Sequence, residues 1–519
     1  MQPDLKLLAG RPVIIGAGLA GLMAALELAP RSVVVITKAK LGENCASAWS
    51  QGGLAAAIAP DDSAELHLAD TLAAGDGLCD EAAARRIIEA GPAIVDRLVS
   101  LGVRFGRDEL GVFKLKLEAA HSRRRVLNAG GDGTGAEIMR AVVEAVRRTP
   151  SITVLEGVAA AELIVGDGIE GVVLASDAET SVLASRAVVL ATGGLGGLWL
   201  HTTNPAGALG QGIAMAARAG AELVDLEFVQ FHPTALDVGR DPMPLASEAI
   251  RGDGAVLIDE TGTRFMEGQG RAELEPRDVV SRAVWQHLGA GHKVYLDTRA
   301  AFGVELPRRF PGIAAACRAA GIDPVTAPMP IRPATHYHMG GVAVDASGRT
   351  SVAGLWACGE TASTGLHGAN RLASNSMLEA AATGLEVAGD LAGRVFPRLG
   401  TTARPRGLPA PDSAGLLAVR GVMSAHVGVL RDRAGLEQAM AALLPIAAGR
   451  GGAVGAAQVG LMIAAAAWLR TESRGGHART DFPAHAAGEV RRRRLTLGEA
   501  LSLAETVAGL APRHASAGD

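Results

Sequence analysis

The feature that most constrains the fold is a glycine-rich turn near the start of the chain. A short apolar run, Val13–Ile15, leads into Gly16-Ala17-Gly18-Leu19-Ala20-Gly21, and a segment rich in Ala and Leu follows. This is the G-x-G-x-x-G pattern in the strand, turn and helix context that binds dinucleotides. The first glycine permits the tight turn, the second lets a pyrophosphate approach the backbone, and the third lets helix and sheet pack closely. A purely structural glycine turn is the alternative interpretation.

Further short apolar runs repeat this pattern along the chain. They occur at Val33 to Thr37 and Ala187 to Ala191, and a strand and glycine pattern returns at Gly354 to Glu360. Strands that alternate with helical segments predict an α/β fold with a parallel sheet. We expect the first and third runs to be neighbouring central strands.

The character of the sequence changes twice. Mixed strands and helices with several prolines occupy the middle, and helical periodicity follows a proline-rich stretch, Thr401 to Pro411, that we interpret as a linker. We predict a Rossmann-like nucleotide-binding domain of residues 1–225 and 338–407. An α+β capping domain, residues 226–337, interrupts it, and a C-terminal helical domain, residues 408–519, follows.

Charge and cysteine content exclude several classes of protein. Fifty basic and 54 acidic residues leave a net charge of -4, so no global field draws the chain to nucleic acid or to an anionic membrane. The four cysteines are far apart and form no C-x-x-C, which argues against a disulfide framework, structural zinc or an iron-sulfur cluster. We therefore expect no metal site and a cytoplasmic location.

Two stretches could be mistaken for a membrane span and for a nucleic-acid-binding segment. Gly451 to Leu469 carries no charge and is long enough to span a bilayer, but its Ala, Gly and Gln content favours a buried core helix. The run Arg491 to Arg494 is most simply a solvated helix face.

The residues after the second apolar run indicate the ligand. The acidic residue that usually holds the ribose of NAD is missing there, and Thr37 and Lys38 take its place. A loop with Ser47, Gln51, Gly52 and Gly53 comes next, and residues 187–194 (A-V-V-L-A-T-G-G) form a further strand that enters a glycine turn. Several glycine turns that converge on one ligand favour a long dinucleotide, FAD.

The middle of the chain carries cations and histidines near glycines. These are His232, Arg251, Arg277, His336 and Arg371. Arginine pairs with a carboxylate through two parallel hydrogen bonds and stays charged, so such a set suits a substrate with two carboxylates. Taken singly, each residue is also compatible with a surface charge or a satisfied core histidine.

In these motifs the chain resembles the flavoprotein family of succinate dehydrogenases, fumarate reductases and L-aspartate oxidases. The resemblance covers nearly the whole chain. Beyond the N-terminal turn, it rests on S-Q-G-G-L-A-A at 50–56, F-V-Q-F-H-P-T at 228–234, P-R-D-V-V at 276–280, H-Y-H-M-G-G at 336–341, G-L-H-G-A-N-R-L-A-S-N-S at 365–376 and E-S-R-G-G-H at 472–477.

The resemblance implies a set of flavin-binding positions. They are Gly16, Ala17, Gly18, Leu19, Gly21, Lys38, Ala46, Ser47, Gln51, Gly52, Gly53, Glu360, Ser376 and Met377. Membrane-bound members of the family attach FAD through a histidine at the position of Ala46. Because alanine cannot form that bond, we expect noncovalent FAD.

The resemblance also implies roles in the substrate site. His232, His336 and Arg371 would hold the substrate carboxylates, and Arg277 would exchange the proton. Glu248 and Arg251 are three residues apart, so on a helix they share a face and could pass a proton towards Arg277; a structural salt bridge is the alternative. Because arginine is ordinarily protonated, the acid or base role requires burial among other cations.

Glu118 matches the residue that selects for the amino group of aspartate, although an exposed loop acid is the alternative. The implied reaction is FAD-dependent oxidation of L-aspartate to iminoaspartate, the first step of NAD biosynthesis, with oxygen or fumarate as the acceptor. Quinolinate synthase is a candidate partner. A flavoprotein subunit of a fumarate reductase or succinate dehydrogenase is the nearest alternative, and a flavin-binding scaffold without turnover is a third.

Three positions depart from the family pattern. Gln211 replaces the aspartate of G-D-G, which puts FAD affinity in doubt, while Asn128 replaces a histidine and Ser247 a threonine. The last two changes look conservative.

Overall fold

A parallel sheet of five strands forms the centre of the computed structural model, which describes residues 4–176, 179–396, 410–488 and 490–509. In spatial order its strands are β17 (Leu355–Ala357), β10 (Val188–Leu190), β1 (Val13–Ile15), β2 (Val33–Thr37) and β6 (Ile152–Glu156). β1 lies between β10 and β2, with Val13 opposite both Val188 and Val34. The prediction that the first and third apolar runs are neighbours is confirmed.

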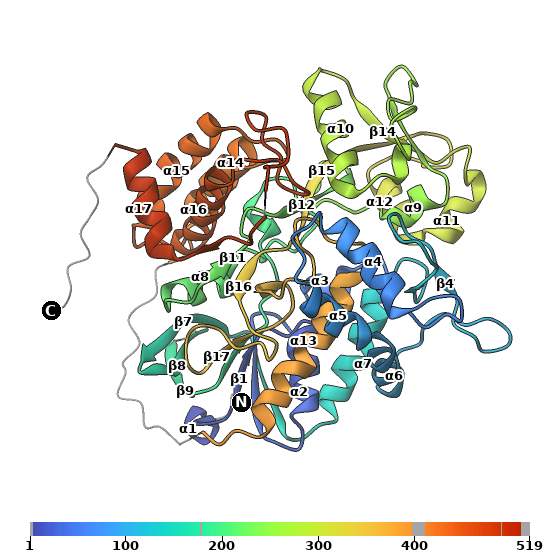
Figure 1. Cartoon of the computed structure of the whole chain (residues 1–519). Coiled ribbons are helices and arrows are strands. Elements are labelled where there is room, and N and C mark those ends of the chain that lie inside the picture. The colour runs from blue at the N-terminus through green and yellow to red at the C-terminus, as the bar shows by residue number, and fades with distance from the viewer. Residues whose placement is uncertain (1–3, 177–178, 397–409, 489, 510–519) are drawn as a thin grey trace.

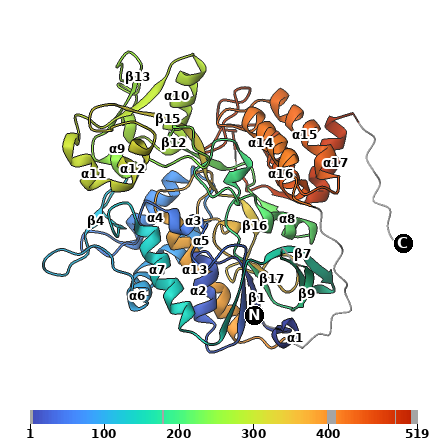
Figure 2. The same cartoon turned by 180° about the vertical axis from the view of Figure 1, so that it is seen from behind.

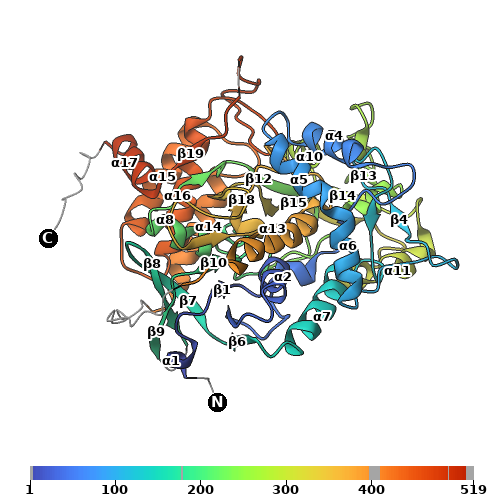
Figure 3. The same cartoon turned by 60° about the horizontal axis from the view of Figure 1, so that its bottom comes forward.

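Both faces of this sheet are covered. Val13 and Ile15 point into one core, and Ile14 points into the other, because side chains alternate along a strand. The first core includes the antiparallel sheet β7 (Ala159–Gly166), β8 (Gly168–Ala175) and β9 (Thr180–Ala184). The second includes α2 (Leu19–Glu27), α7 (Thr134–Arg147) and α13 (Asn375–Ala392), which pack on one another (Figure 3). This is the Rossmann-like arrangement predicted from the sequence.

A long excursion between β2 and β6 supplies further parts of the nucleotide-binding region. Its elements are α3 (Ala46–Trp49), β3 (Leu54–Ala55), α4 (Ala64–Ala74), α5 (Glu81–Glu89), α6 (Gly91–Ser100), β4 (Leu115–Lys116) and β5 (Val126–Leu127). β3, β5 and β4 form a small antiparallel sheet. α13 contacts both β3 and α5, so this excursion packs against the same helix that covers the main sheet.

The segment inserted after β11 (Leu223–Val224) forms the cap, the lobe at the upper right of Figure 1. Its antiparallel sheet has the order β12 (Val229–Leu236), β15 (Met329–His338), β14 (Val294–Asp297) and β13 (Val256–Asp259). Its helices are α9 (Glu248–Gly252), α10 (Arg277–Gly289), α11 (Leu306–Arg309) and α12 (Pro311–Ala319). The cap has its own apolar core, whose buried residues lie between Leu236 and Ile331.

The C-terminal helices lie beside the cap in both Figure 1 and Figure 2. They are α14 (Ser413–His426), α15 (Arg433–Ala447), α16 (Val454–Leu469) and α17 (Leu497–Val507). α16 packs against the other three and against α8 (Gln211–Arg218), and most of its side chains are buried. The uncharged stretch is therefore a core helix, as predicted. Over the described ranges, no helix combines the length and the apolar character needed to cross a bilayer.

One prediction about the C-terminal region is wrong. The arginine run does not lie on a helix: its last residue begins β19 (Arg494–Leu495), which pairs with β11, and the preceding three residues belong to no helix or strand. Arg492 donates to Asp225 at 2.5 Å and Arg494 pairs with Glu222. Acidic residues from a distant part of the sequence hold this run in place, and the spacing of residues along the chain does not reveal such partners. The expected linker falls mostly outside the described residues.

Candidate active site

A continuous cavity of about 670 Å³ joins the parallel sheet to the cap. Its wall includes Gly16 in the turn after β1, Lys38 after β2 and Arg277 at the start of α10. Ligands of open α/β sheets bind at the carboxyl ends of the strands, where β1 and β2 open into this space. The predicted nucleotide and substrate regions therefore share one cavity.

The three glycines of the N-terminal turn meet different surroundings. Gly16 has φ +115°, and a Cβ there would lie 2.1 Å from the carbonyl oxygen of Ala191. A Cβ on Gly21 would lie 2.2 Å from the carbonyl oxygen of Gly16, so this residue allows α2 to pack closely; it does not line the cavity. A Cβ on Gly18 would meet only the Ser47 hydroxyl, at 3.4 Å, and would point into space that a ligand can use.

The other predicted flavin-binding residues all line the cavity. They are Ala17, Leu19, Lys38, Ala46, Ser47, Gln51, Gly52, Gly53, Glu360, Ser376 and Met377. Burial lowers the pKa of Lys38 and raises the pKa of Glu360 to about 7. Ser376 and Met377 lie in the first turn of α13, so the partial positive charge of the helix N-terminus faces this part of the wall.

Three observations test whether this wall fits FAD. Backbone lines it at Gly16 and Gly18, as the close approach of a pyrophosphate requires. Gln51 has a buried side-chain oxygen without a hydrogen-bond partner, and Ala46 presents only a methyl group. The cavity continues past both residues to the buried cations of the cap. These features suit a long dinucleotide that is held without a covalent bond.

A buried chain of ion pairs lies at the cap end of the cavity. Nε and Nη2 of Arg277 donate to Oε2 of Glu248 at 3.0 and 2.8 Å, and Nη2 of Arg251 donates to Oε1 of Glu248 at 3.0 Å. Burial raises the pKa of Glu248, but the charges of Arg277 and Arg251 outweigh it and lower that pKa to about 2. Glu248 is therefore ionised.

Arg251 does not reach the cavity. It is fully buried behind Glu248, and its Nη1 donates to the carbonyl oxygen of Glu273 at 2.5 Å. The helical spacing of Glu248 and Arg251 predicts a shared face, and the pair forms a salt bridge there. Arg251 is placed to hold Glu248 and has no contact with a substrate in the cavity.

Two histidines and one further arginine also line the cap end of the cavity. The rings of His232 and His336 are 5.1 Å apart, and burial, then the charge of Arg277, lowers the pKa of each well below the ordinary value. Nε2 of His232 and Nε of Arg371 are buried without partners. Burial and then Arg277 lower the pKa of Arg371 to about 10, so it stays charged at neutral pH. Neutral imidazoles and a cation with unused donors are suited to carboxylates.

Glu118 also lines the cavity and is buried, in contrast to the alternative of an exposed loop acid. Its Oε2 accepts a hydrogen bond from the Ser374 hydroxyl at 2.7 Å, and that hydroxyl also accepts from the amide of Gly53 at 3.2 Å. Burial, and then the charge of Glu248, raises the pKa of Glu118. An acid therefore faces the cation-rich end of the cavity.

Gln230 belongs to the same site, although nothing in F-V-Q-F-H-P-T singled it out. Its Oε1 accepts from Nη1 of Arg277 at 2.8 Å, and its Nε2 donates to the carbonyl oxygen of Arg371 at 2.8 Å. It thus connects the two arginines. The only available signal is its place in β12, immediately before a bulge and two residues before the predicted His232.

Of the three residues that depart from the family pattern, two line the cavity and one does not. Gln211 and Ser247 line the cavity, Gln211 as the first residue of α8 and Ser247 as the residue before α9. Asn128 does not line it, and its side-chain oxygen is buried without a partner.

Comparison with known proteins agrees with this geometry. A family model described as an FAD binding domain matches residues 11–377, and one described as the fumarate reductase flavoprotein C-terminus matches residues 455–504. Among solved structures, a point mutant of the quinol fumarate reductase flavoprotein FrdA of E. coli has a TM-score of 0.83 at 26% identity, covering 92% of each chain. Sdh1 of Mycobacterium smegmatis in complex with UQ1 has a TM-score of 0.79 at 30% identity, covering 94% of each chain.

Curated relatives are more similar in sequence. The L-aspartate oxidase of Mesorhizobium japonicum is 54% identical over 512 residues, covering 98% of each chain. The L-aspartate oxidase of Agrobacterium fabrum is 54% identical over 495 residues, covering 95% of each. The chain therefore belongs to the L-aspartate oxidase family of FAD-binding flavoproteins.

Proposed function

We propose that this chain is an FAD-dependent L-aspartate oxidase, which converts L-aspartate to iminoaspartate and begins NAD biosynthesis. The observation that carries the proposal is that one cavity contains both the glycine-lined cradle and the buried set of Arg277, Arg371, His232, His336 and Glu118. A four-carbon diacid with an amino group has a complement for each of its charges there. The L-aspartate oxidases that are 54% identical support the same conclusion.

FAD, when bound, supplies the redox chemistry by accepting the hydride from C2 of aspartate. The residues that line the glycine-rich part of the cavity would hold it, and the methyl side chain of Ala46 implies that no covalent bond forms. We assign carboxylate binding to Arg371, His232 and His336, because all three line the cavity and Nε2 of His232 and Nε of Arg371 have no hydrogen-bond partner. Binding both carboxylates fixes the position of C2.

We assign the ammonium group of aspartate to Glu118. An ionised Glu118 pairs with the ammonium, whereas succinate and fumarate have nothing at this position. As the hydride leaves C2, one proton passes from the ammonium group to the carboxylate of Glu118, and the protonated imine results. The Ser374 hydroxyl holds Glu118 in place through the 2.7 Å hydrogen bond.

We assign proton exchange with bound dicarboxylates to Arg277. Glu248, held ionised between Arg251 and Arg277, fixes the guanidinium of Arg277 through two hydrogen bonds. Glu248, the direct neighbour of Arg277, can pass a proton to Arg277 after the guanidinium has given one to a bound dicarboxylate. Arg251 acts in this assignment as a positioning residue for Glu248.

We propose oxygen and fumarate as electron acceptors and quinolinate synthase as the enzyme that consumes the imine. Fumarate has the same two carboxylates as aspartate, so the same cations suit it. The four cysteines are free, which supports a reducing compartment such as the cytoplasm.

The test is an anaerobic titration of the purified yellow protein with L-aspartate. We expect the flavin absorbance to bleach with L-aspartate and to return when fumarate or oxygen is added. Succinate at the same concentration serves as the control without an amino group. A spectrum that L-aspartate leaves unchanged would refute the proposed function.

A further inference from the structure

A cluster of two histidines and a carboxylate lies on the cap, outside the cavity. One side-chain ligand atom from each of Asp259, His287 and His292 lies within 4.8 Å of the others. Among the described residues, this is the only such group of three His, Cys, Asp or Glu side chains. Asp259 ends β13, His287 lies in the last turn of α10, and His292 lies in the connection from α10 to β14. Tertiary contacts bring the three together from two parts of the sequence.

The carboxylate is held so that one oxygen remains available. Oδ1 of Asp259 accepts hydrogen bonds from the hydroxyl and amide of Thr261 and from the amide of Thr263, at 2.6 to 3.0 Å. These bonds fix the carboxylate through Oδ1. Oδ2 faces Nε2 of His287 at 3.3 Å.

Ring packing and a second carboxylate hold the histidines. The ring of His287 stacks between Phe265 and His292, with centroid distances of 4.4 and 4.2 Å. Nδ1 of His292 lies 2.9 Å from Oε1 of Glu260, whose other oxygen accepts from the amide of Lys293 at 2.8 Å. A carboxylate on one ring nitrogen is the usual way of orienting a histidine whose other nitrogen binds a metal.

We propose that Asp259, His287 and His292 form a binding site for a divalent transition-metal ion of the Zn²⁺ class. Two imidazole nitrogens and one carboxylate oxygen are a ligand set that Zn²⁺ takes up with a water at the fourth position. The side chains of His287 and His292 are 20% and 40% exposed, so an ion can enter from solvent. Because the rings of His287 and His292 stack at an angle of 17°, their in-plane lone pairs do not converge on one point, and binding of one ion by both requires one ring to turn out of the stack.

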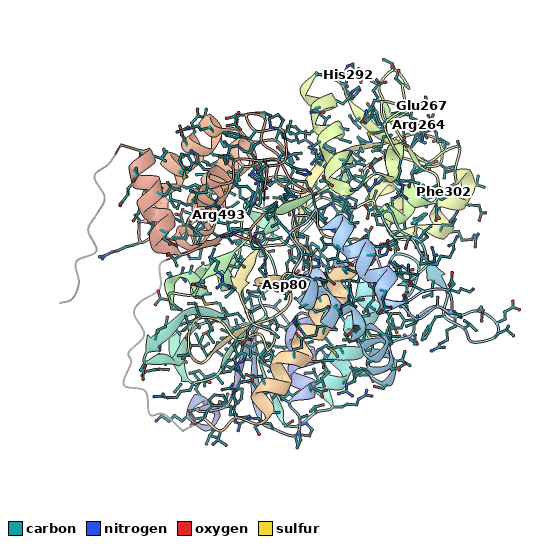
Figure 4. All side chains as sticks on the ribbon, viewed as in Figure 1. Asp80, Arg264, Glu267, His292, Phe302 and Arg493 are labelled. Atoms are coloured by element: carbon teal, nitrogen blue, oxygen red, sulfur yellow. The ribbon has the colours of Figure 1, made fainter. Side chains whose placement is uncertain are left out.

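The site is separate from the reaction. His287 lies ten residues after Arg277 on α10, a rise of about 15 Å along the helix. Figure 4 shows His292 at the outer rim of the cap. An ion there ties the end of β13 to the end of α10 within one lobe, so we assign it a structural role in the cap.

The experiment is a calorimetric titration of tag-free holoenzyme with Zn²⁺ after removal of metals by a chelator. We expect one Zn²⁺ to bind per chain. His292→Gln should weaken binding by more than about a hundredfold, and Glu260→Gln by about tenfold, as the loss of an orienting carboxylate does elsewhere.

The matched control is His485→Gln, which removes an exposed histidine from the C-terminal region. Unchanged Zn²⁺ affinity in His485→Gln alongside the loss in His292→Gln supports the site. Equal affinity in both variants, or no stoichiometric binding by the unaltered protein, overturns it. Because His292 is on the surface, its variant should keep the flavin spectrum and the thermal midpoint measured without metal, which separates lost binding from misfolding.

Discussion

The two ends of the cavity are built by different means. At the sheet end, main chain forms much of the wall, because Gly16, Gly18 and Gly53 place no side chain there. At the cap end, charged side chains form the wall, and each depends on another buried side chain: Arg277 on Glu248, and Glu118 on Ser374. Changes at the sheet end should therefore affect folding or FAD retention, whereas changes at the cap end should affect turnover and selectivity.

The largest effect should come from Arg277→Leu. The substitution removes the group that we assign to proton exchange and leaves Glu248 with one cationic partner. We expect kcat/KM for dicarboxylate turnover, measured as fumarate reduction, to fall by about a thousandfold or more, while the protein stays yellow. Steady-state kinetics and the flavin spectrum measure the two effects. Arg277→Lys, which keeps the charge but lacks the second hydrogen bond to Glu248, should be intermediate; unchanged activity in the Leu variant contradicts the assignment.

Next in size is Gly16→Ala. A methyl group would lie 2.1 Å from the carbonyl oxygen of Ala191, at a φ of +115° that L residues rarely adopt. We expect the free energy of unfolding to drop by about 3 kcal/mol, measured by denaturant titration.

Gly18→Ala is the matched control for Gly16→Ala, because its methyl group meets only the Ser47 hydroxyl, at 3.4 Å. Stability should change by less than about 1 kcal/mol, but FAD should dissociate more readily because the methyl group occupies the cavity. Equal destabilisation by the two substitutions would show that the glycines do not have separate roles.

A smaller effect is expected from Glu118→Gln. Losing the charge beside the ammonium group should lower kcat/KM for L-aspartate by about ten- to a hundredfold, as for a hydrogen bond to a charged group. Fumarate reduction by the reduced enzyme should change much less, because fumarate has no amino group. Glu109→Gln, in an exposed loop, is the control. Equal losses with both substrates would remove the basis for the assignment.

The smallest effect at neutral pH concerns the titration of Glu118. Burial and the charge of Glu248 raise its pKa, and only the ionised form pairs with an ammonium group. The value of kcat/KM for L-aspartate should therefore rise with pH through an acid limb above the ordinary glutamate pKa of about 4.3. Glu118→Gln should abolish this limb. A limb that persists in the variant belongs to another group.

Local patterns predicted much of the molecule. The strand, glycine and helix signals placed β1, β2 and β10 and their neighbours, and the uncharged stretch before Leu469 is the core helix α16. Every flavin-binding residue that the motif resemblance named, except Gly21, lines the cavity. These features could be predicted because hydrophobic periodicity and glycine turns act over a few residues.

Other features depended on contacts between distant segments. Gln230 connects Arg277 to Arg371, and Arg251 lies behind Glu248 without reaching the cavity. The arginine run, predicted as a helix face, is not helical, and Arg492 and Arg494 pair with acidic residues more than 260 positions away in the sequence.

The amino-acid order by itself determined the nucleotide-binding sheet, the dinucleotide it prefers and the identity of the buried cations, since each of these is recorded in short stretches of residues. Only the tertiary structure decided which cations face the cavity, which acid stays ionised between two guanidinium groups, and that Asp259, His287 and His292 meet at the rim of the cap. Burial and the distances between charges set these properties, and both arise only when segments far apart in the chain pack together.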